Sequence, residues 1–147
     1  MIETCFGCRL ANKEEPVHMI WENDYVSCFL DHLPFNDGHV LILPKKHVRY
    51  LHEMDETTLM EVMGAVQLIS AGVHQAFEPD GITICQNGGS FDDLTHFHMH
   101  VVPRCKGQDF AEFYREDTEE AAANSTRLLE TKDKLVKAIL HCEVGVK

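Results

Sequence analysis

The stretch Thr-His-Phe-His-Met-His-Val-Val-Pro-Arg, residues 95–104, carries a histidine at every second position. Side chains at i, i+2 and i+4 of a β-strand share one face, so His96, His98 and His100 should point the same way, each about 6.6 Å from the next. The outer two would then lie about 13 Å apart, whereas Zn–N bonds measure only about 2.0–2.1 Å. One metal ion cannot easily collect all three, and we expect the three histidines to have separate tasks.

Length and composition indicate a single folded domain, residues 1–147. Of the 147 residues, 44% are hydrophobic and 25% are charged, which is ordinary for a globular protein. No apolar run approaches the roughly 18 residues that a membrane-spanning helix needs, so we expect no membrane partner. The first residues contain neither a basic segment nor a long apolar segment, and on that ground we expect a cytoplasmic protein.

The charge of the chain is strongly negative but unevenly spread. A net charge of −11 argues against a nucleic-acid partner, because binding to the phosphate backbone needs clustered basic residues. Lys45, Lys46 and Arg49 nevertheless lie close together and leave room for a local positive pocket. Five carboxylates crowd residues 112–120, and we interpret this run as the solvated start of a helix.

The six cysteines occur without any mark of secretion, so a disulfide framework is not expected. Cys5-Phe6-Gly7-Cys8 stands apart, because two thiolates separated by two residues on a tight turn can bind one Zn²⁺. From this spacing alone, a metal site, a redox pair and neither remain open. The four scattered cysteines are interpreted as small buried hydrophobic residues: Cys28, Cys85, Cys105 and Cys142.

The hydrophobic periodicity predicts five strands and two long helices. Apolar runs bounded by turn residues indicate strands along the histidine stretch and over four other ranges: 17–21, 26–30, 39–44 and 81–86. Apolar residues at i, i+3 and i+4 indicate a helix of about 55–77, with Asp55 as its N-cap, and another of about 118–141. The expected fold class is α+β with a largely antiparallel sheet.

The histidine stretch matches the signature of the histidine-triad (HIT) superfamily, His-φ-His-φ-His-φ-φ, where φ is apolar. With Cys5-x-x-Cys8, the chain resembles the bacterial zinc-containing, Hint-like branch. The resemblance covers roughly residues 5–105, followed by a C-terminal helical extension, 106–147, and it implies a HIT-like fold and a homodimer. Four other segments resemble family segments and occur in family order: Phe29–Asp31, Gly38–His47, Asn87-Gly88 and Pro103-Arg104.

The resemblance also implies a role for each residue that matches a family motif. His98 would be the nucleophile that attacks the α-phosphorus of a nucleotide, and His39 and His100 would flank the phosphate. Asp31 would accept hydrogen bonds from the ribose hydroxyls. Core packing is an equal alternative for the apolar members of a second set, which would contact the nucleotide: Phe6, Leu10, Phe29, His32, Asn87 and Asp93. A structural zinc ion would be held by four residues: Cys5, Cys8, His47 and His96.

One segment departs from the family pattern. Family hydrolases often carry a Gly-Gln-Ser/Thr run just before the triad. Here Asp92 and Asp93 occupy the corresponding places, in a loop that is shorter by about one residue. Carboxylates beside a phosphate repel an anionic substrate unless they are protonated, metal-bound or turned away.

Three functional hypotheses follow. The first is a nucleotide hydrolase or nucleotidyl transferase that acts on purine nucleoside phosphoramidates or related monophosphate derivatives through a covalent nucleotidyl-histidine, releasing the nucleoside monophosphate. The second is a dinucleoside polyphosphate hydrolase, in which Lys45, Lys46, Arg49 or Arg104 would supply positive charge for the longer leaving group. The third, motivated by the altered loop, is a non-catalytic zinc- and nucleotide-binding module.

Overall fold

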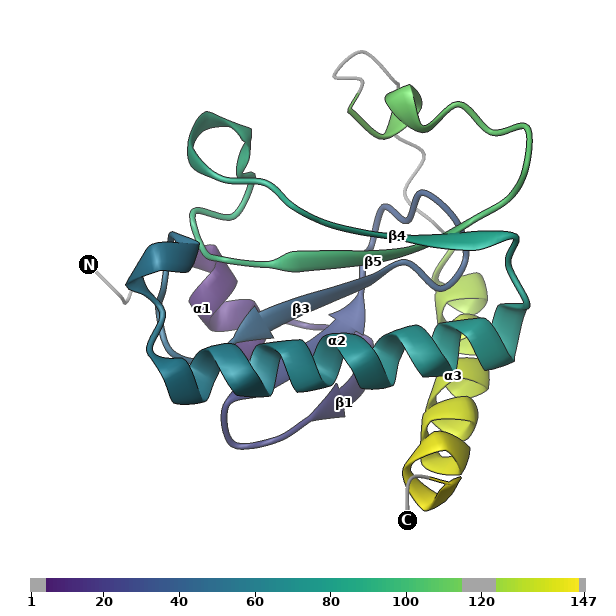
Figure 1. Cartoon of the computed structure of the whole chain (residues 1–147), viewed down its shortest axis with the longest axis horizontal. Coiled ribbons are helices and arrows are strands. Elements are labelled where there is room, and N and C mark those ends of the chain that lie inside the picture. The colour runs from purple at the N-terminus through teal and green to yellow at the C-terminus, as the bar shows by residue number, and fades with distance from the viewer. Residues whose placement is uncertain (1–4, 115–123, 146–147) are drawn as a thin grey trace.

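The computed structural model describes residues 5–114 and 124–145 of the chain (Figure 1). A short N-terminal helix precedes a five-stranded sheet, and two long helices pack beside the sheet. Three short 3₁₀ turns lie between these elements: η2 (Leu51–Glu53), η3 (Gly89–Phe91) and η4 (Phe110–Tyr114). The main elements in chain order are α1 (Phe6–Ala11), β1 (Met19–Glu22), β2 (Val26–Leu30), β3 (Val40–Pro44), α2 (Glu56–Phe77), β4 (Gly81–Gln86), β5 (Met99–Arg104) and α3 (Ser125–Gly145).

The sheet is antiparallel throughout, with the strand order β1-β2-β3-β5-β4. The predicted α+β class, the five strands and the hairpin of β1 and β2 are therefore confirmed. β5 lies between β3 and β4, so His100 is flanked by Leu41 on one side and Cys85 on the other. The last histidine of the triad is thus held inside the sheet rather than at its edge.

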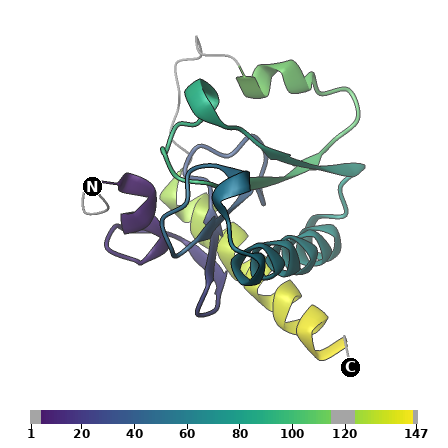
Figure 2. The same ribbon diagram turned by 60° about the vertical axis from the view of Figure 1, so that its left-hand side comes forward.

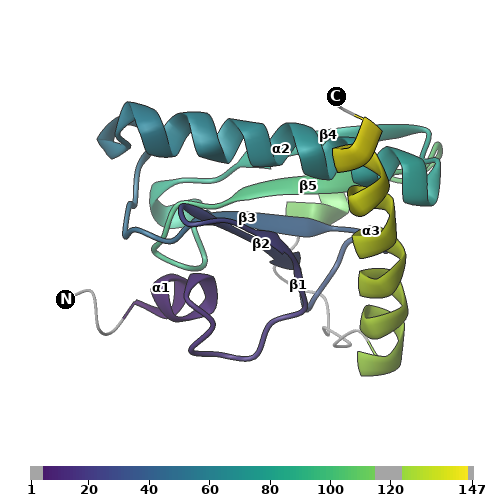
Figure 3. The same ribbon diagram turned by 90° about the horizontal axis from the view of Figure 1, so that it is seen from below.

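The two faces of the sheet are covered by different helices. Figure 3 shows α2 along one face and α1 against the other, with α3 running past the end of the sheet. Along β3, Val40 and Ile42 join the main core under α2, whereas Leu41 and Leu43 join a smaller cluster with Ala11 of α1. All five residues of β3 are buried, as its continuous apolar run predicts.

The first long helix closely matches the prediction for residues 55–77. Asp55 caps α2, because its carboxylate accepts a hydrogen bond from the backbone N–H of Thr58 at 2.9 Å. At the other end, Glu78 adopts a left-handed conformation with φ of 44°, and the helix stops there. Local sequence chemistry is sufficient to set both ends of this element.

The predicted strand through the whole histidine stretch is wrong in its first half. β5 begins only at Met99, so residues 96–98 precede it. The backbone N–H of Phe97 donates to the carbonyl of Val48 at 2.7 Å, outside the ladders between the strands. Thr95 has a positive φ of 52°, which turns the chain just before the first histidine. The alternation of faces nevertheless persists, since Phe97 is buried in the main core under α2.

The second long helix begins later than predicted. α3 starts at Ser125. Of the acidic run at 112–120, Glu112 lies in η4, and the rest lies outside the described residues, as does most of the predicted start of the helix. Leu128, Leu135 and Ile139 are buried in the main core, where α3 packs across α2 and against β1 (Figure 2).

Neither this helix nor any other in the described part of the chain is long and apolar enough to span a membrane.

Two glycines of α2 give a direct test of the packing between α2 and α3. A Cβ atom at Gly72 would lie 2.6 Å from Cγ1 of Ile139, whereas a Cβ at the exposed Gly64 would meet nothing within 4 Å. We predict that Gly72→Ala lowers the free energy of unfolding by about 1–3 kcal/mol. Gly64→Ala should raise it by about 0.5–1 kcal/mol, because alanine favours the helix. Urea denaturation of both variants measures this, and shifts of the same sign would contradict the packing described.

Candidate functional site

Three histidines, of which His100 lies in β5 and His39 and His98 directly precede β3 and β5, meet on the sheet face opposite α2. The ring centroids of His98 and His100 are 5.0 Å apart, and those of His39 and His100 are 5.2 Å apart. His39 directly precedes β3, which pairs with β5, so the sheet itself brings the predicted catalytic set together. All three side chains are buried.

The hydrogen bonds of His98 fix which of its ring nitrogens can react. Its Nδ1 lies 2.8 Å from the carbonyl oxygen of His96. A carbonyl oxygen can only accept, so Nδ1 carries the proton and, in the neutral ring, Nε2 keeps its lone pair. The acceptor that a nucleophilic histidine needs is therefore a backbone atom of the residue two positions earlier.

A second chain of hydrogen bonds fixes the other two rings. The backbone N–H of Phe35 donates to Nδ1 of His39 at 3.1 Å, so the proton of the neutral His39 ring is on Nε2. That Nε2 lies 2.9 Å from Nδ1 of His100, to which it donates. In the neutral ring of His100, the proton is consequently on Nε2. The site thus offers one lone pair, on His98, and one N–H donor, on His100.

Burial keeps His39 and His100 uncharged. It lowers the pKa of His100 from 6.5 to about 3, and the neighbouring rings of His39 and His98 act in the same direction. Burial likewise lowers the pKa of His39, with the Asp31 carboxylate opposing the shift. At neutral pH, His100 is therefore a neutral hydrogen-bond donor rather than a cation.

Asp31 joins this cluster through the backbone ladder between β2 and β3. Its backbone N–H donates to the carbonyl of His39 at 3.0 Å, and its Oδ2 lies 3.6 Å from Nε2 of His39. Its Oδ1 accepts a hydrogen bond from the backbone N–H of Leu33 at 3.0 Å. Gly38 makes the turn into β3 with φ of 94°, where any Cβ would lie 2.6 Å from the ring of Phe77. The sheet and this turn together place a carboxylate beside the histidines.

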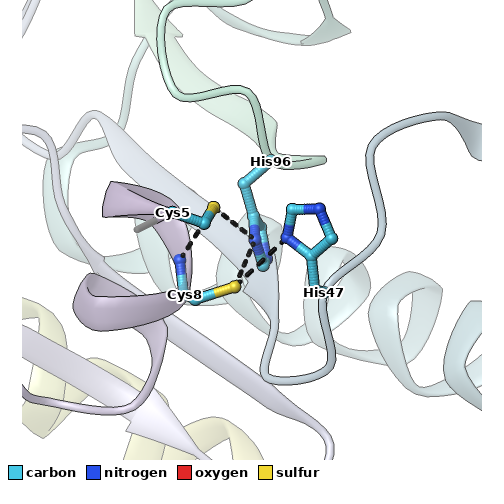
Figure 4. A group of neighbouring side chains, drawn as sticks. All are labelled: Cys5, Cys8, His47 and His96. Carbon is cyan, nitrogen blue, oxygen red and sulfur yellow. Dashed lines mark hydrogen bonds between the residues drawn. The ribbon is translucent and has the colours of Figure 1, made fainter. Parts of the chain in front are cut away.

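A second cluster gathers the two cysteines of the Cys-x-x-Cys pair with two histidines (Figure 4). Nδ1 of His47 lies 3.2 Å from Sγ of Cys8, and Nδ1 of His96 lies 3.4 Å from Cys8 and 3.6 Å from Cys5. All four ligand atoms lie within 4.8 Å of one another. A tetrahedral zinc ion with ordinary bond lengths needs sulfur–nitrogen separations of about 3.5 Å, so the spacing fits a four-coordinate metal.

The surroundings of this cluster orient its ligands. Nε2 of His96 donates to the carbonyl of Pro44 at 2.8 Å, which leaves Nδ1 unprotonated and facing the sulfur atoms. Burial, with Cys5 adding to the effect, raises the pKa of the Cys8 thiol to about 12, so thiolates here need a cation. Gly7 belongs to α1 and not to a tight turn as expected. A Cβ there would lie 2.3 Å from Cβ of His96, so glycine permits the close approach of α1.

The remaining predicted nucleotide contacts fall into three environments. Phe29 is 2% exposed in the smaller core cluster, and Leu10 packs against that cluster. Three members lie at the surface: Phe6, His32 and Asp93. Asn87 is half-buried directly after β4.

The two carboxylates of the altered loop are not alike. Asp93 is exposed, whereas the Asp92 side chain is fully buried with Oδ1 3.6 Å from Nδ1 of His98. Asp92 therefore lies on the Nδ1 side of that ring and not beside Nε2.

Other sequence interpretations are partly corrected. All six cysteines are free, and burial of the scattered ones holds for Cys28 but is wrong for the exposed Cys105. Lys45 and Lys46, which could form a local positive pocket, lie 3.0 Å and 3.4 Å from carboxylates of Glu22 and Asp55. Their charges are thus matched by nearby anions.

Sequence reasoning missed an aromatic contribution from η4. The ring of Phe113 lies 5.2 Å from His100 and 5.8 Å from His39, and it packs against Phe35 and Phe110. The spacing of aromatic residues at 110, 113 and 114 is a signal for such a cluster, but the return of the chain over the histidines is not visible in sequence.

The sequence of the chain is similar to one domain-family model and to several known proteins. The sequence model of the HIT domain matches residues 12–107. An uncharacterized HIT-like protein of Methanocaldococcus jannaschii is 33% identical over 105 residues, which are 70% of this chain and 81% of that protein. Adenylylsulfatase HINT3 of Arabidopsis thaliana is 31% identical over 68% of this chain and 52% of its own length. Adenosine 5'-monophosphoramidase hnt1 of Schizosaccharomyces pombe is 25% identical over 69% and 74%.

Solved structures are similar over most of the chain. A crystal structure of a Hit-like protein from Bartonella henselae superposes with a TM-score of 0.78 and 33% identity, covering 88% of this chain and 92% of that one. A hypothetical histidine triad nucleotide-binding protein from Sulfolobus tokodaii superposes with a TM-score of 0.83 and 25% identity, covering 97% and 96%.

The lowered pKa of His100 predicts how stability depends on pH. Between pH 6.5 and about 3, residue 100 is protonated in the unfolded chain but not in the folded protein, where the His100 ring is buried. The free energy of unfolding should therefore fall as the pH is lowered through this range. His100→Asn should make this slope shallower, whereas His74→Asn, at an exposed position of α2, should leave it unchanged. Urea denaturation at a series of pH values measures the slopes. Equal slopes in the three proteins would reject the shift.

Proposed function

The chain belongs to the HIT domain family, and from that premise we propose that it is a nucleotide hydrolase or nucleotidyl transferase acting at the α-phosphate of purine nucleoside phosphoramidates or related monophosphate derivatives. The observation that carries the proposal is the hydrogen bond from Nδ1 of His98 to the carbonyl of His96, which leaves Nε2 free to attack. The names of two relatives, an adenylylsulfatase and an adenosine 5'-monophosphoramidase, support this substrate class.

The reaction proceeds in two displacements. The lone pair of His98 Nε2 forms a bond to the α-phosphorus, and the phosphorus–nitrogen bond of the substrate breaks with its electron pair going to the amine, which takes a proton from solvent. Water then attacks the phosphorus and releases its proton to solvent, while the electron pair of the phosphorus–Nε2 bond returns to His98. The nucleoside monophosphate is released and His98 is regenerated.

The neighbours of His98 stabilise charge during these steps. His100 donates its Nε2–H to a phosphate oxygen, on which negative charge grows as the phosphorus is attacked. His39 keeps His100 in the donating form through the 2.9 Å hydrogen bond between their rings. Neither ring has to gain or lose a proton, which agrees with their burial.

Asp31, Leu10, Phe6 and His32 recognise the nucleoside. A carboxylate that only accepts hydrogen bonds matches the two vicinal hydroxyls of a ribose. Asp31 lies beside His39, so a ribose bound there would lead directly to the phosphate. The purine would be lined by three side chains: Phe6 and Leu10 of α1, and His32.

We further propose that the four-residue cluster holds a structural zinc ion. Cys5 at the N-cap of α1, Cys8 within α1, His47 after β3 and His96 before β5 would provide a closed tetrahedral site. When bound, zinc supplies no chemistry to the substrate and ties three segments together. The orientation of the His96 ring by Pro44 supports this role.

One observation favours a small leaving group over a polyphosphate. A dinucleoside polyphosphate needs free positive charge beyond the α-phosphate, and Lys45 and Lys46 are paired with carboxylates. The two arginines named for the same role are held by other contacts. Arg104 donates to the hydroxyl of Thr83, and its guanidinium lies 4.1 Å from the ring centroid of Phe110. The guanidinium of Arg49 lies 5.5 Å from the ring centroid of Tyr50.

The nucleophile is tested by His98→Ala. We predict that release of AMP from adenosine 5′-phosphoramidate falls by on the order of 10³-fold or more, because the variant lacks the nitrogen that forms the proposed covalent intermediate. Affinity for AMP should remain close to that of the wild type. His74→Ala, an exposed histidine of α2, is the matched control and should retain full activity. Diadenosine tetraphosphate assayed in parallel separates the two substrate classes. Turnover that survives in His98→Ala would reject the covalent mechanism.

The zinc site is tested by Cys5→Ser. We predict loss of bound zinc and a fall in Tm of about 5 °C or more, given that 1 kcal/mol corresponds to roughly 2–4 °C in a chain of this size. Cys105→Ser, which changes an exposed cysteine, should bind zinc like the wild type. Metal analysis after extensive dialysis and thermal melts measure both quantities. Equal zinc content in the two variants would show that Cys5 is not a ligand.

A further inference from the structure

Asp92 is a buried carboxylate that the proposed reaction does not yet use. Its side chain has no exposed surface, although it lies in a loop between η3 and β5. Oδ1 accepts a hydrogen bond from the backbone N–H of Leu94 at 2.9 Å. Oδ2 is buried and accepts no hydrogen bond from any residue in the ranges 5–114 and 124–145. Burying a carboxylate in this way lowers stability unless a positive charge faces it.

The group that faces Asp92 is the ring of His98. Oδ1 lies 3.6 Å from Nδ1, too far for a good hydrogen bond but close for a charge, and Nδ1 already donates to the carbonyl of His96. The His98 side chain is only 4% exposed, so water screens the interaction weakly. A carboxylate on this side of the ring can act on Nε2 only through the ring itself.

We propose that Asp92 is a positioning residue that stabilises the positive ring formed when His98 becomes bonded to phosphorus. The inference rests on the proposed covalent reaction and adds a residue to it. In the first displacement, Nε2 gives its lone pair to phosphorus while Nδ1 keeps its proton, so the imidazole ring becomes a cation. The charge disappears when the second displacement returns the electron pair to Nε2. The Asp92 carboxylate opposes the ring charge at Nδ1.

The loop geometry holds Asp92 in this place. Its turn with Leu94 and the left-handed conformation of Thr95 bring the chain back under the triad. A β-branched residue with positive φ is costly and persists only where its surroundings enforce it. The carboxylate lies behind the nucleophile, which places it away from the phosphate bound at Nε2. This removes the repulsion that Asp92 would cause if it faced the phosphate.

The test compares Asp92→Asn with Asp24→Asn. The first variant removes the charge and keeps an oxygen for the N–H of Leu94, whereas the second removes the same charge at an exposed turn between β1 and β2. We expect Asp92→Asn to slow the single-turnover release of ammonia from adenosine 5′-phosphoramidate by about 10- to 100-fold, with AMP affinity unchanged. Asp24→Asn should match the wild type. A single-turnover rate of Asp92→Asn within twofold of the wild type would overturn the proposal.

Two further measurements separate other causes. Asp92 also lies within electrostatic reach of His96, so zinc content and Tm are measured in each variant. A rate lost together with zinc would overturn the proposal in favour of an effect on the metal site.

The ¹H–¹⁵N signal of the His98 Nδ1–H gives a readout that needs no turnover, and we expect it to move upfield in Asp92→Asn. A wild type that cleaves no phosphoramidate would reject the proposed substrate, whereas an unmoved signal would reject the role of Asp92.

Discussion

The hydrogen bond that the carbonyl of His96 accepts from Nδ1 of His98 links the two clusters of the site. His96 turns its ring toward the cysteine pair and its backbone toward the nucleophile. The residue therefore belongs to the metal cluster by its side chain and to the triad by its main chain. A shift of α1, packed on His96 at Gly7, would displace the acceptor that selects the reactive tautomer of His98. The Cys5/Cys8/His47/His96 cluster and the cluster of His39, His98 and His100 are in this sense one assembly.

Much of the fold was predictable because its signals are local. Asp55 and the apolar spacing after it mark α2, and the apolar run of β3 reports that both of its faces are covered. The bounds of β4 were also predicted, since turn residues flank the strand. The set of histidines and cysteines followed from the family resemblance. Strand pairing brings His39 and His100 together, and the packing of α1 on His96 brings the two cysteines to the second cluster. These features need only the neighbours of each residue in sequence or the pairing of strands.

The remaining features depend on contacts between distant segments, so no sequence period reveals them. β5 begins only after His98, because the backbone N–H of Phe97 donates a hydrogen bond to the carbonyl of Val48 and Thr95 turns the chain. The proton positions on the rings follow from the backbone groups of Phe35 and His96, which carry no side-chain signal. The two adjacent aspartates looked equivalent in sequence. Only the path of the loop distinguishes a buried carboxylate from an exposed one.

Phe113 gives the site a wall that comes from outside the segment matched by the family. The His98 ring and its tautomer are set by a buried backbone hydrogen bond beside the sheet, whereas this wall belongs to η4, a short turn after the last strand. Substitutions in residues 110–114 can therefore reshape the space beside His100 while the reacting atoms stay in place. Selection can tune substrate range and catalytic competence in such a protein as separate traits. Divergence among its relatives would then be expected to accumulate in this turn before it reaches the triad.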